Sequence, residues 1–390
     1  MFVADILKVL YAPHKVFKTI TQNPKYWGPL LIFVLFIALQ SAFYYSFYSK
    51  TYYEQTTPAI SNLGEWTESV TLWTNYSGVV VSSNYLDFMN SSFYGNSSLQ
   101  FDASNANSIS IEIPRFSDVN CTPSAFTALS MRIKQADPQV APIGATLTLY
   151  SLGTADTFKY DLTNDLSNTS VIGTWNNITI PVGGDNSDWQ TNGNPTWQNI
   201  TGLKLDLNFP SAASKISLRV AGLFFRGSFQ SPVKTDFGGF VIYALQLVVT
   251  QFLFQWLLFT GIMFIVIKGL KGTIVWKPLF IAVGFALTIT LIQSIINSAS
   301  LTTLPAINYP VEVLTGLPVE STVLANAISM NATTYTLIAS VIQLITYVWI
   351  VALGSLIVRA LEPEFTWLKC IATSAVGFIV TILLMSILGV

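Results

Sequence analysis

Five long stretches without a charged residue dominate this chain. They cover residues 27–48, 240–266, 278–296, 335–358 and 370–390, and none contains Asp, Glu, Lys, Arg or His. A helix needs about 20 apolar residues to cross the hydrocarbon core of a bilayer. Only 10% of the chain is charged, whereas soluble proteins carry about 25% charged residues. The sequence therefore predicts an integral membrane protein with five transmembrane helices, and it disfavours a soluble helical core.

The basic residues near these stretches indicate an orientation. They gather before the first stretch and in the loops after the second and the fourth: Lys8, Lys15, Lys18, Lys25, Lys268, Lys271, Lys277, Arg359 and Lys369. The loop of residues 297–334 has no Lys or Arg. Because short cytoplasmic loops are enriched in Lys and Arg, the pattern predicts a plasma-membrane protein with a cytoplasmic N-terminus. The segment 50–237 and the C-terminus are then extracytoplasmic.

Residues 1–26 form a separate cytoplasmic segment in this prediction. Apolar residues recur at helical spacing from Phe2 to Ile20, with lysines between them, and Pro13 favours the start of a second short helix. The pattern predicts an amphipathic segment on the inner leaflet of the lipid bilayer. The alternative is a helix that docks on the protein's own cytoplasmic loops.

Residues 50–237 have the pattern of an all-β domain. Six alternating or β-branched runs are separated by clusters of Gly, Asn, Asp, Ser and Pro. These runs are 108–113, 127–133, 145–150, 177–182, 203–209 and 216–225. The predicted fold class is therefore a five-span α-helical bundle with an extracytoplasmic β-sandwich of the jelly-roll type. The predicted divisions are 1–26, a span at 27–48, the sandwich at 50–237, and a four-helix transmembrane region at 238–390.

Glycosylation motifs agree with this orientation. Asn-X-Ser/Thr occurs at Asn75, Asn90, Asn96, Asn120, Asn168, Asn177, Asn199 and Asn331. All eight lie in segments predicted to be extracytoplasmic, which suggests a surface glycoprotein. Cys121 and Cys370, the two cysteines, fall on opposite sides of the membrane in this topology and cannot pair. An exported domain without disulfides suggests an archaeal cell surface.

Part of the β domain resembles a known family. The runs GTWNNITIP (173–181), WQNITGL (197–203) and LRVAGLFF (218–225) resemble the second half of a galactose-binding-like or carbohydrate-binding-module jelly roll. The resemblance implies a β-sandwich and surface glycans as ligands. The chain departs from the family pattern at Ala221, which stands where an acidic residue is usual.

The membrane region resembles a second family. The runs LYAPHKVFKTI (10–20) and NPKYWGPLL (23–31) are similar to the approach to the first span in the YIP (Ypt/Rab-interacting) family. The resemblance implies a five-span layout with the N-terminus inside the cell. The β domain is then an insertion between the first two spans.

The sequence offers few groups for catalysis. His14, the only histidine, lies in the basic N-terminal segment. It has no Cys or second His beside it for a zinc site, and no Ser-His-Asp or Cys-His set can be assembled from the sequence. No metal, cofactor or nucleic-acid partner is predicted, and we expect no enzyme. The best ligand-binding candidate is Trp189 as an aromatic platform for a sugar, with polar groups beside it from Asp185, Asp188 and Asn192. Asp185 and Asp188 also suit a plain polar turn.

Amide side chains interrupt the predicted spans at Gln246, Gln251, Gln255, Gln293, Asn297 and Gln343. Such residues usually hydrogen-bond between helices, and the alternative is a polar pathway. The predicted function is a noncatalytic scaffold or accessory subunit of an envelope complex. It would bind glycans or other membrane or surface proteins through the β-sandwich. The alternative function is a channel or transporter with amide-lined helices.

Overall fold

The computed structural model describes residues 2–74, 76, 78–89, 92–167, 172–316 and 318–389. The chain folds into two compact units. The helical unit consists of Met1–Tyr52, Ser231–Ile307 and Asn326–Val390. The β unit consists of Tyr53–Gln230 and Asn308–Ala325. The second part of the β unit is a segment that the sequence-based division left with the helices.

Five helices of the described chain are long and apolar enough to cross a membrane, and each coincides with one predicted span. Four of the spans belong to α3 (Trp27–Tyr48), α7 (Phe237–Gly269), the later part of α11 (Pro318–Leu361) and α12 (Trp367–Leu388). The fifth span consists of α8 (Trp276–Ala286) followed by α9 (Thr288–Leu301). The hydroxyl groups of Thr288 and Thr290 donate to the carbonyl oxygens of Phe285 and Leu287 at the break between these two helices.

The N-terminal segment forms α1 (Phe2–Tyr11) and α2 (Pro13–Gln22). Pro13 does begin the second helix, as the sequence predicts. Five apolar side chains of these helices are buried in the core of the helical unit, and α2 packs against α8: Ile6, Val9, Val16, Phe17 and Ile20. These buried side chains share a core with helices of the candidate spans. A position of the segment on the inner leaflet stays a prediction, as does docking on the cytoplasmic loops.

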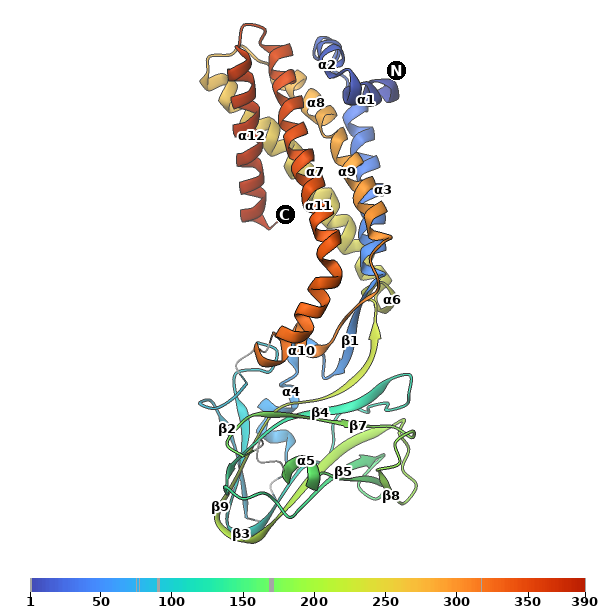
Figure 1. Ribbon diagram of the computed structural model, residues 1–390, viewed down its shortest axis with the longest axis vertical. Helices are drawn as coiled ribbons and strands as arrows, with labels where there is room; N and C mark the ends of the chain where they lie inside the picture. Colours follow the sequence, from blue (N-terminus) through green and yellow to red (C-terminus); the bar gives the residue numbers. More distant parts are fainter. Residues whose placement is uncertain are drawn as a thin grey trace. The chain divides into compact units, whose positions relative to one another are not determined.

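The helices of the helical unit run alongside one another (Figure 1), and close side-chain contacts hold them together. The Trp256 ring of α7 stacks on Phe280 of α8 with the ring centroids 4.2 Å apart. A Cβ atom at Gly284 would lie 2.7 Å from Pro29 and 2.8 Å from Trp256. A larger residue at position 284 would therefore push the helices apart, which explains the need for glycine there.

The β unit is one curled, sandwich-like sheet built around two long strands, β3 (Ser98–Ile113) and β9 (Ile200–Gln230). In the first half-sheet, the early part of β3 pairs with the later part of β9. This half-sheet also contains β2 (Val79–Asn84), β4 (Phe126–Asp137) and β7 (Asn176–Pro181). β1 (Thr51–Thr57) pairs with the end of β9, and β10 (Ile307–Tyr309) adds to β1.

The second half-sheet pairs the later part of β3 with the early part of β9. It continues through β5 (Gly144–Ser151), β6 (Thr157–Asp161) and β8 (Gln190–Asn192). The register between β3 and β9 shifts between Ala106 and Ser108, and this bulge lets both strands pass from one half-sheet to the other. The β prediction is confirmed, but the runs 203–209 and 216–225 belong to one continuous strand.

Short helices complete the β unit: η1 (Ile60–Asn62), α4 (Glu65–Glu68), η2 (Val70–Leu72), α5 (Thr163–Ser167) and α10 (Val311–Leu314). α6 (Pro232–Thr235) belongs to the helical unit. Aromatic side chains fill the core of the β unit, where Trp66 stacks on Phe116 at 4.5 Å between ring centroids. Val311 of α10 is fully buried against Leu63 and Phe224.

A nearly buried ion cluster ties α10 to the strands. The Arg226 guanidinium donates from Nε and Nη2 to the two carboxylate oxygens of Glu54, both at 2.8 Å. It also donates from Nη2 to Oε2 of Glu312 at 3.1 Å. Burial alone would favour the uncharged guanidine, but the hydrogen bonds and charges of Glu54 and Glu312 outweigh it and raise the pKa of Arg226. The guanidinium therefore stays charged at any accessible pH.

Candidate functional site

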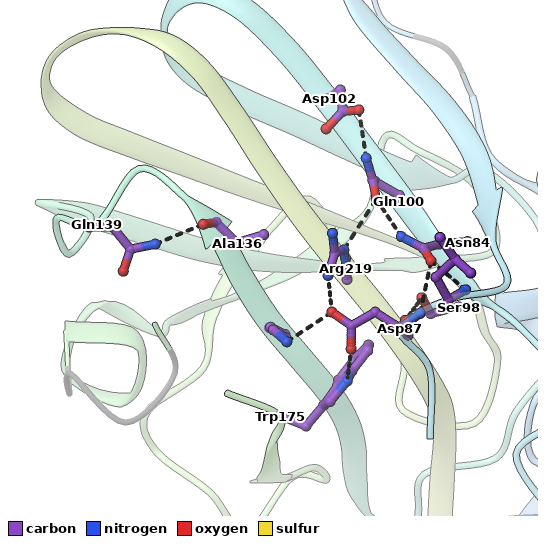
Figure 2. A network of polar contacts seen from close by, with 11 residues as sticks. Asn84, Asp87, Ser98, Gln100, Asp102, Ala136, Gln139, Trp175 and Arg219 are labelled. Carbon is purple, nitrogen blue, oxygen red and sulfur yellow. Dashed lines mark hydrogen bonds and ion pairs between the residues drawn. The ribbon is translucent and has the colours of Figure 1, made fainter. Parts of the chain in front are cut away.

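A network of polar side chains lies on the outer face of the first half-sheet, centred on Asp87 (Figure 2). The Asp87 carboxylate accepts hydrogen bonds from Trp175 Nε1 at 2.9 Å and from Lys134 Nζ at 2.8 Å. Arg219 donates to the same carboxylate and, through Nε, to Gln100 Oε1 at 3.1 Å. We call these five residues the Asp87 cluster.

Further hydrogen bonds fix the orientation of this cluster. Asn84 donates to Gln100 Oε1 at 2.6 Å, and Gln100 donates to Asp102 Oδ2 at 2.8 Å. The Asn84 carboxamide oxygen also accepts from the backbone N–H of Asp87 at 2.9 Å. Asp87 is therefore held at a turn, and its carboxylate needs no rearrangement to keep its partners.

Strand alternation explains why these residues share one face. Arg219 of β9 lies between Gln100 of β3 and Lys134 of β4 in the strand register. Their neighbours along the strands point into the core and are buried: Leu99, Phe101, Ile133, Leu218 and Val220. Because side chains in a strand alternate between faces, the polar set must point outward. Trp175 comes just before β7 and is half-buried.

The Asp87 cluster is accessible from solvent and carries an excess of positive charge. The side chains of Arg219, Asp87 and Lys134 are 21%, 25% and 18% exposed. The carboxylate of Asp87 faces two cations, Lys134 and Arg219. The planar side chains of Asp87, Gln100 and Arg219 hold their donors and acceptors in fixed positions, so each can contact two neighbouring hydroxyl groups of a ligand. The Trp175 indole offers an apolar surface beside them. The arrangement suits a hydroxyl-rich ligand that is neutral or acidic.

A cavity of about 510 Å³ lies next to this network. Its lining includes Phe209, Pro210 and Lys215, and Lys215 Nζ lies 3.5 Å from Asp102 Oδ1. Gln139, which also lines the cavity, donates to the backbone oxygen of Ala136 at 2.8 Å (Figure 2). The cavity extends the candidate surface from the strands to the loop between β4 and β5.

The outer face of the second half-sheet carries a separate polar set. Tyr76 donates to Glu112, and Lys204 Nζ lies 3.0 Å from Asp206 Oδ1 and 5.5 Å from the Tyr76 ring centroid. The hydrogen bond to Glu112, together with burial, raises the pKa of Tyr76 to about 12. Asp206 also lines a groove of about 360 Å³. Within the described residues, no group of three or more His, Cys, Asp and Glu side chains could hold a metal ion.

The predicted sugar platform at Trp189 is wrong. Its side chain is only 7% exposed, its Nε1 donates to the Pro181 carbonyl oxygen at 2.8 Å, and its ring packs against Tyr160 and Trp197. The three polar residues predicted beside it, Asp185, Asp188 and Asn192, do lie exposed on the surface. A ligand role for them stays a prediction, but it has lost its aromatic partner.

The predicted glycosylation sites fall in different environments. Asn96 and Asn120 are exposed, Asn177 and Asn199 are half-buried, and Asn331 belongs to α11. The Oδ1 atom of Asn177 is buried without a partner among the described residues. Asn75, Asn90 and Asn168 lie outside the described residues. Occupancy of these motifs remains a prediction.

Five of the six predicted intramembrane amides line a single cavity in the helical unit: Gln251, Gln255, Gln293, Asn297 and Gln343. Gln40 joins them, and its Oε1 accepts a hydrogen bond from Ser294 of α9 at 2.7 Å. Gln246 does not line this cavity and is exposed on the surface of α7. It lies within the candidate span of α7, and an interhelical hydrogen bond from it stays a prediction.

The Asp87 cluster was not predicted from the sequence. Its members come from five separate segments, and only long-range strand pairing brings them together. Two signals were present: Arg219 is a charged residue that alternates with core residues in a predicted strand, and Lys134 and Trp175 lie beside the ends of two other predicted strands.

Solved structures similar to this chain include several carbohydrate-binding modules. One is the family 11 module from Clostridium thermocellum in complex with a β-1,3-1,4-mixed-linked tetrasaccharide, at 14% identity over 40% of this chain and 90% of that chain, with a TM-score of 0.28. Another is the CBM22-1 xylan-binding domain of Paenibacillus barcinonensis Xyn10C, at 13% identity over 43% and 91%, with a TM-score of 0.26. No family model and no curated protein matches the chain, so the YIP resemblance remains a prediction.

Proposed function

We propose that this protein is a noncatalytic, membrane-anchored glycan-binding protein whose ligand lies on the Asp87 cluster. The observation that carries the proposal is the half-buried Trp175 indole held beside a fixed set of planar polar groups. Sugars present both an apolar C–H face and a rim of hydroxyl groups, and the cluster offers a complement to each. The positive excess from Lys134 and Arg219 favours glycans that contain uronic acids.

The cluster is ordered before any ligand arrives. Asp87 keeps three side-chain partners, and the Asn84 turn fixes its backbone. Binding then costs little side-chain entropy, because these rotamers are already restricted. The five apolar helices would hold this surface at a membrane.

A glycan array tests the proposal with the full chain in phospholipid nanodiscs. We expect the wild type to bind a subset of neutral or uronic-acid glycans. Arg219→Gln and Trp175→Ala should each weaken that binding at least tenfold, since each removes either paired donors or the apolar surface. The far-UV circular-dichroism spectrum and the melting temperature should match those of the wild type in both variants.

The matched control is Lys204→Gln, which removes one cation from the outer face of the second half-sheet. Glycan binding should stay at the wild-type level in this variant. Lost binding in Lys204→Gln with intact binding in Arg219→Gln would assign the ligand to the other face and contradict the proposal. A wild type that binds no glycan would contradict it altogether.

A further inference from the structure

A cavity of about 360 Å³ lies among the apolar helices, and all five predicted spans contribute to its wall. The wall carries the amides of Gln40, Gln251, Gln255, Gln293, Asn297 and Gln343. Small-molecule sites typically have volumes of about 300–1,000 Å³. The size alone therefore permits a ligand, and the chemistry of the wall decides which kind.

Several of these amides lack partners. Gln255 is only 7% exposed, and it makes no hydrogen bond with any residue that the structure describes. Oε1 of Gln251 and Oδ1 of Asn297 are likewise buried without a partner in the described chain. Gln343, in contrast, donates to the Tyr347 hydroxyl at 2.6 Å. An unmade hydrogen bond at a buried polar group costs about 1–3 kcal/mol, so a ligand whose hydrogen-bonding groups reach these amides would gain free energy from them.

Among the described residues that line it, the cavity has amides and hydroxyls but no carboxylate, ammonium, guanidinium or imidazole group. An ion would lose its hydration without gaining an opposite charge. Each amide offers both donors and an acceptor, as each hydroxyl group of a sugar does. Phe36 and Ile350 add apolar contacts to the same wall, which match the C–H face of a sugar ring.

We propose that this cavity binds an uncharged polyhydroxyl group, either a free sugar or polyol or the head group of a neutral glycolipid. The site is separate from the Asp87 cluster, and the proposal does not depend on glycan binding by the β unit. Gln255, Gln251 and Asn297 supply the hydrogen bonds that the ligand completes.

The test uses the full chain in phospholipid nanodiscs. Binding of radiolabelled glucose, galactose, mannose and glycerol is measured in one arm. Retention of glucosyl diacylglycerol is measured by native mass spectrometry in the other arm, so that the two sources are distinguished. We expect saturable binding in one arm, and at least a tenfold loss in Gln255→Leu and in Asn297→Leu. The matched control Gln246→Leu removes an amide from the same helix outside the cavity and should bind like the wild type.

Thermal unfolding without ligand separates a ligand site from structural amides. Replacing an unpartnered buried amide with leucine should leave the melting temperature unchanged or raise it. A fall in melting temperature in both Gln255→Leu and Asn297→Leu would show that the amides hold the helices together, and would overturn the proposal. It would also be overturned if no probe bound saturably to the wild type, as for a cavity filled only by water, or if binding survived in the leucine variants.

Discussion

Arg226→Met should destabilise the β unit by about 3–5 kcal/mol, because removing one partner of a buried ion cluster leaves the other charges unpaired. The side chains of Glu54, Arg226 and Glu312 are only 8%, 15% and 13% exposed. The cluster already has one carboxylate more than it has cations, and the substitution leaves two carboxylates facing each other. For a unit of this size the loss corresponds to a fall in melting temperature of about 6–20 °C.

Differential scanning calorimetry of the purified chain measures this effect. Two further variants make the result specific. Adding Glu54→Gln and Glu312→Gln to Arg226→Met should recover most of the stability, since no unpaired charge remains. Lys204→Met breaks a more exposed pair with Asp206 and should cost no more than about 1 kcal/mol. Equal losses for Arg226→Met and Lys204→Met would contradict a special role for the buried cluster.

The spans could be predicted because each one is a local property of composition. In lipid, a single uncharged run such as 27–48 can make all its backbone hydrogen bonds internally only if it forms a helix. Which face each amide occupies was also within reach of the sequence. Gln246 and Gln255 are nine residues apart, or about 2.5 helical turns, so they point in opposite directions, whereas Gln251 is about one turn from Gln255.

The continuity of β9 could not be predicted from the local signal. Pro210 and Ser211 have the composition of a turn, and they lie where the strand changes its pairing from Asn208 to Ala213 along β3. Pro210 therefore interrupts no ladder bond with β3 at that point. The Asp87 cluster and the ion cluster of Arg226, Glu54 and Glu312 could not be predicted for another reason. Both depend on strand pairing between residues more than a hundred positions apart, and a single sequence carries no sign of such pairs.

The loop between the third and fourth predicted spans contributes to the β unit, which its composition did not indicate. Residues 308–325 belong to the β unit together with 53–230. If five spans alternate across a membrane, the segment after the first span and the segment after the third emerge on the same side. Their association in one unit supports an alternating five-span topology, while the basic residues alone supply its direction.

Labelling of intact cells with a membrane-impermeant thiol reagent tests which side of the membrane each segment faces, and it should give an all-or-none result. Asp118→Cys and Ser187→Cys introduce thiols at exposed positions of the β unit, and we expect both to react. Lys271→Cys and Glu364→Cys introduce thiols at exposed positions in the loops after α7 and α11, and we expect both to react only after the cells are permeabilised.

The native chain is a suitable background for this experiment. Cys121 and Cys370 are both buried and free, and burial raises the pKa of the Cys121 thiol to about 12. Because only the thiolate reacts, the unmodified protein should stay unlabelled at neutral pH. Reaction of Lys271→Cys or Glu364→Cys in intact cells, with protected Asp118→Cys and Ser187→Cys, would reverse the orientation. It would also remove the glycan-binding surface from the cell exterior, because the Asp87 cluster lies in the same unit as Asp118 and Ser187.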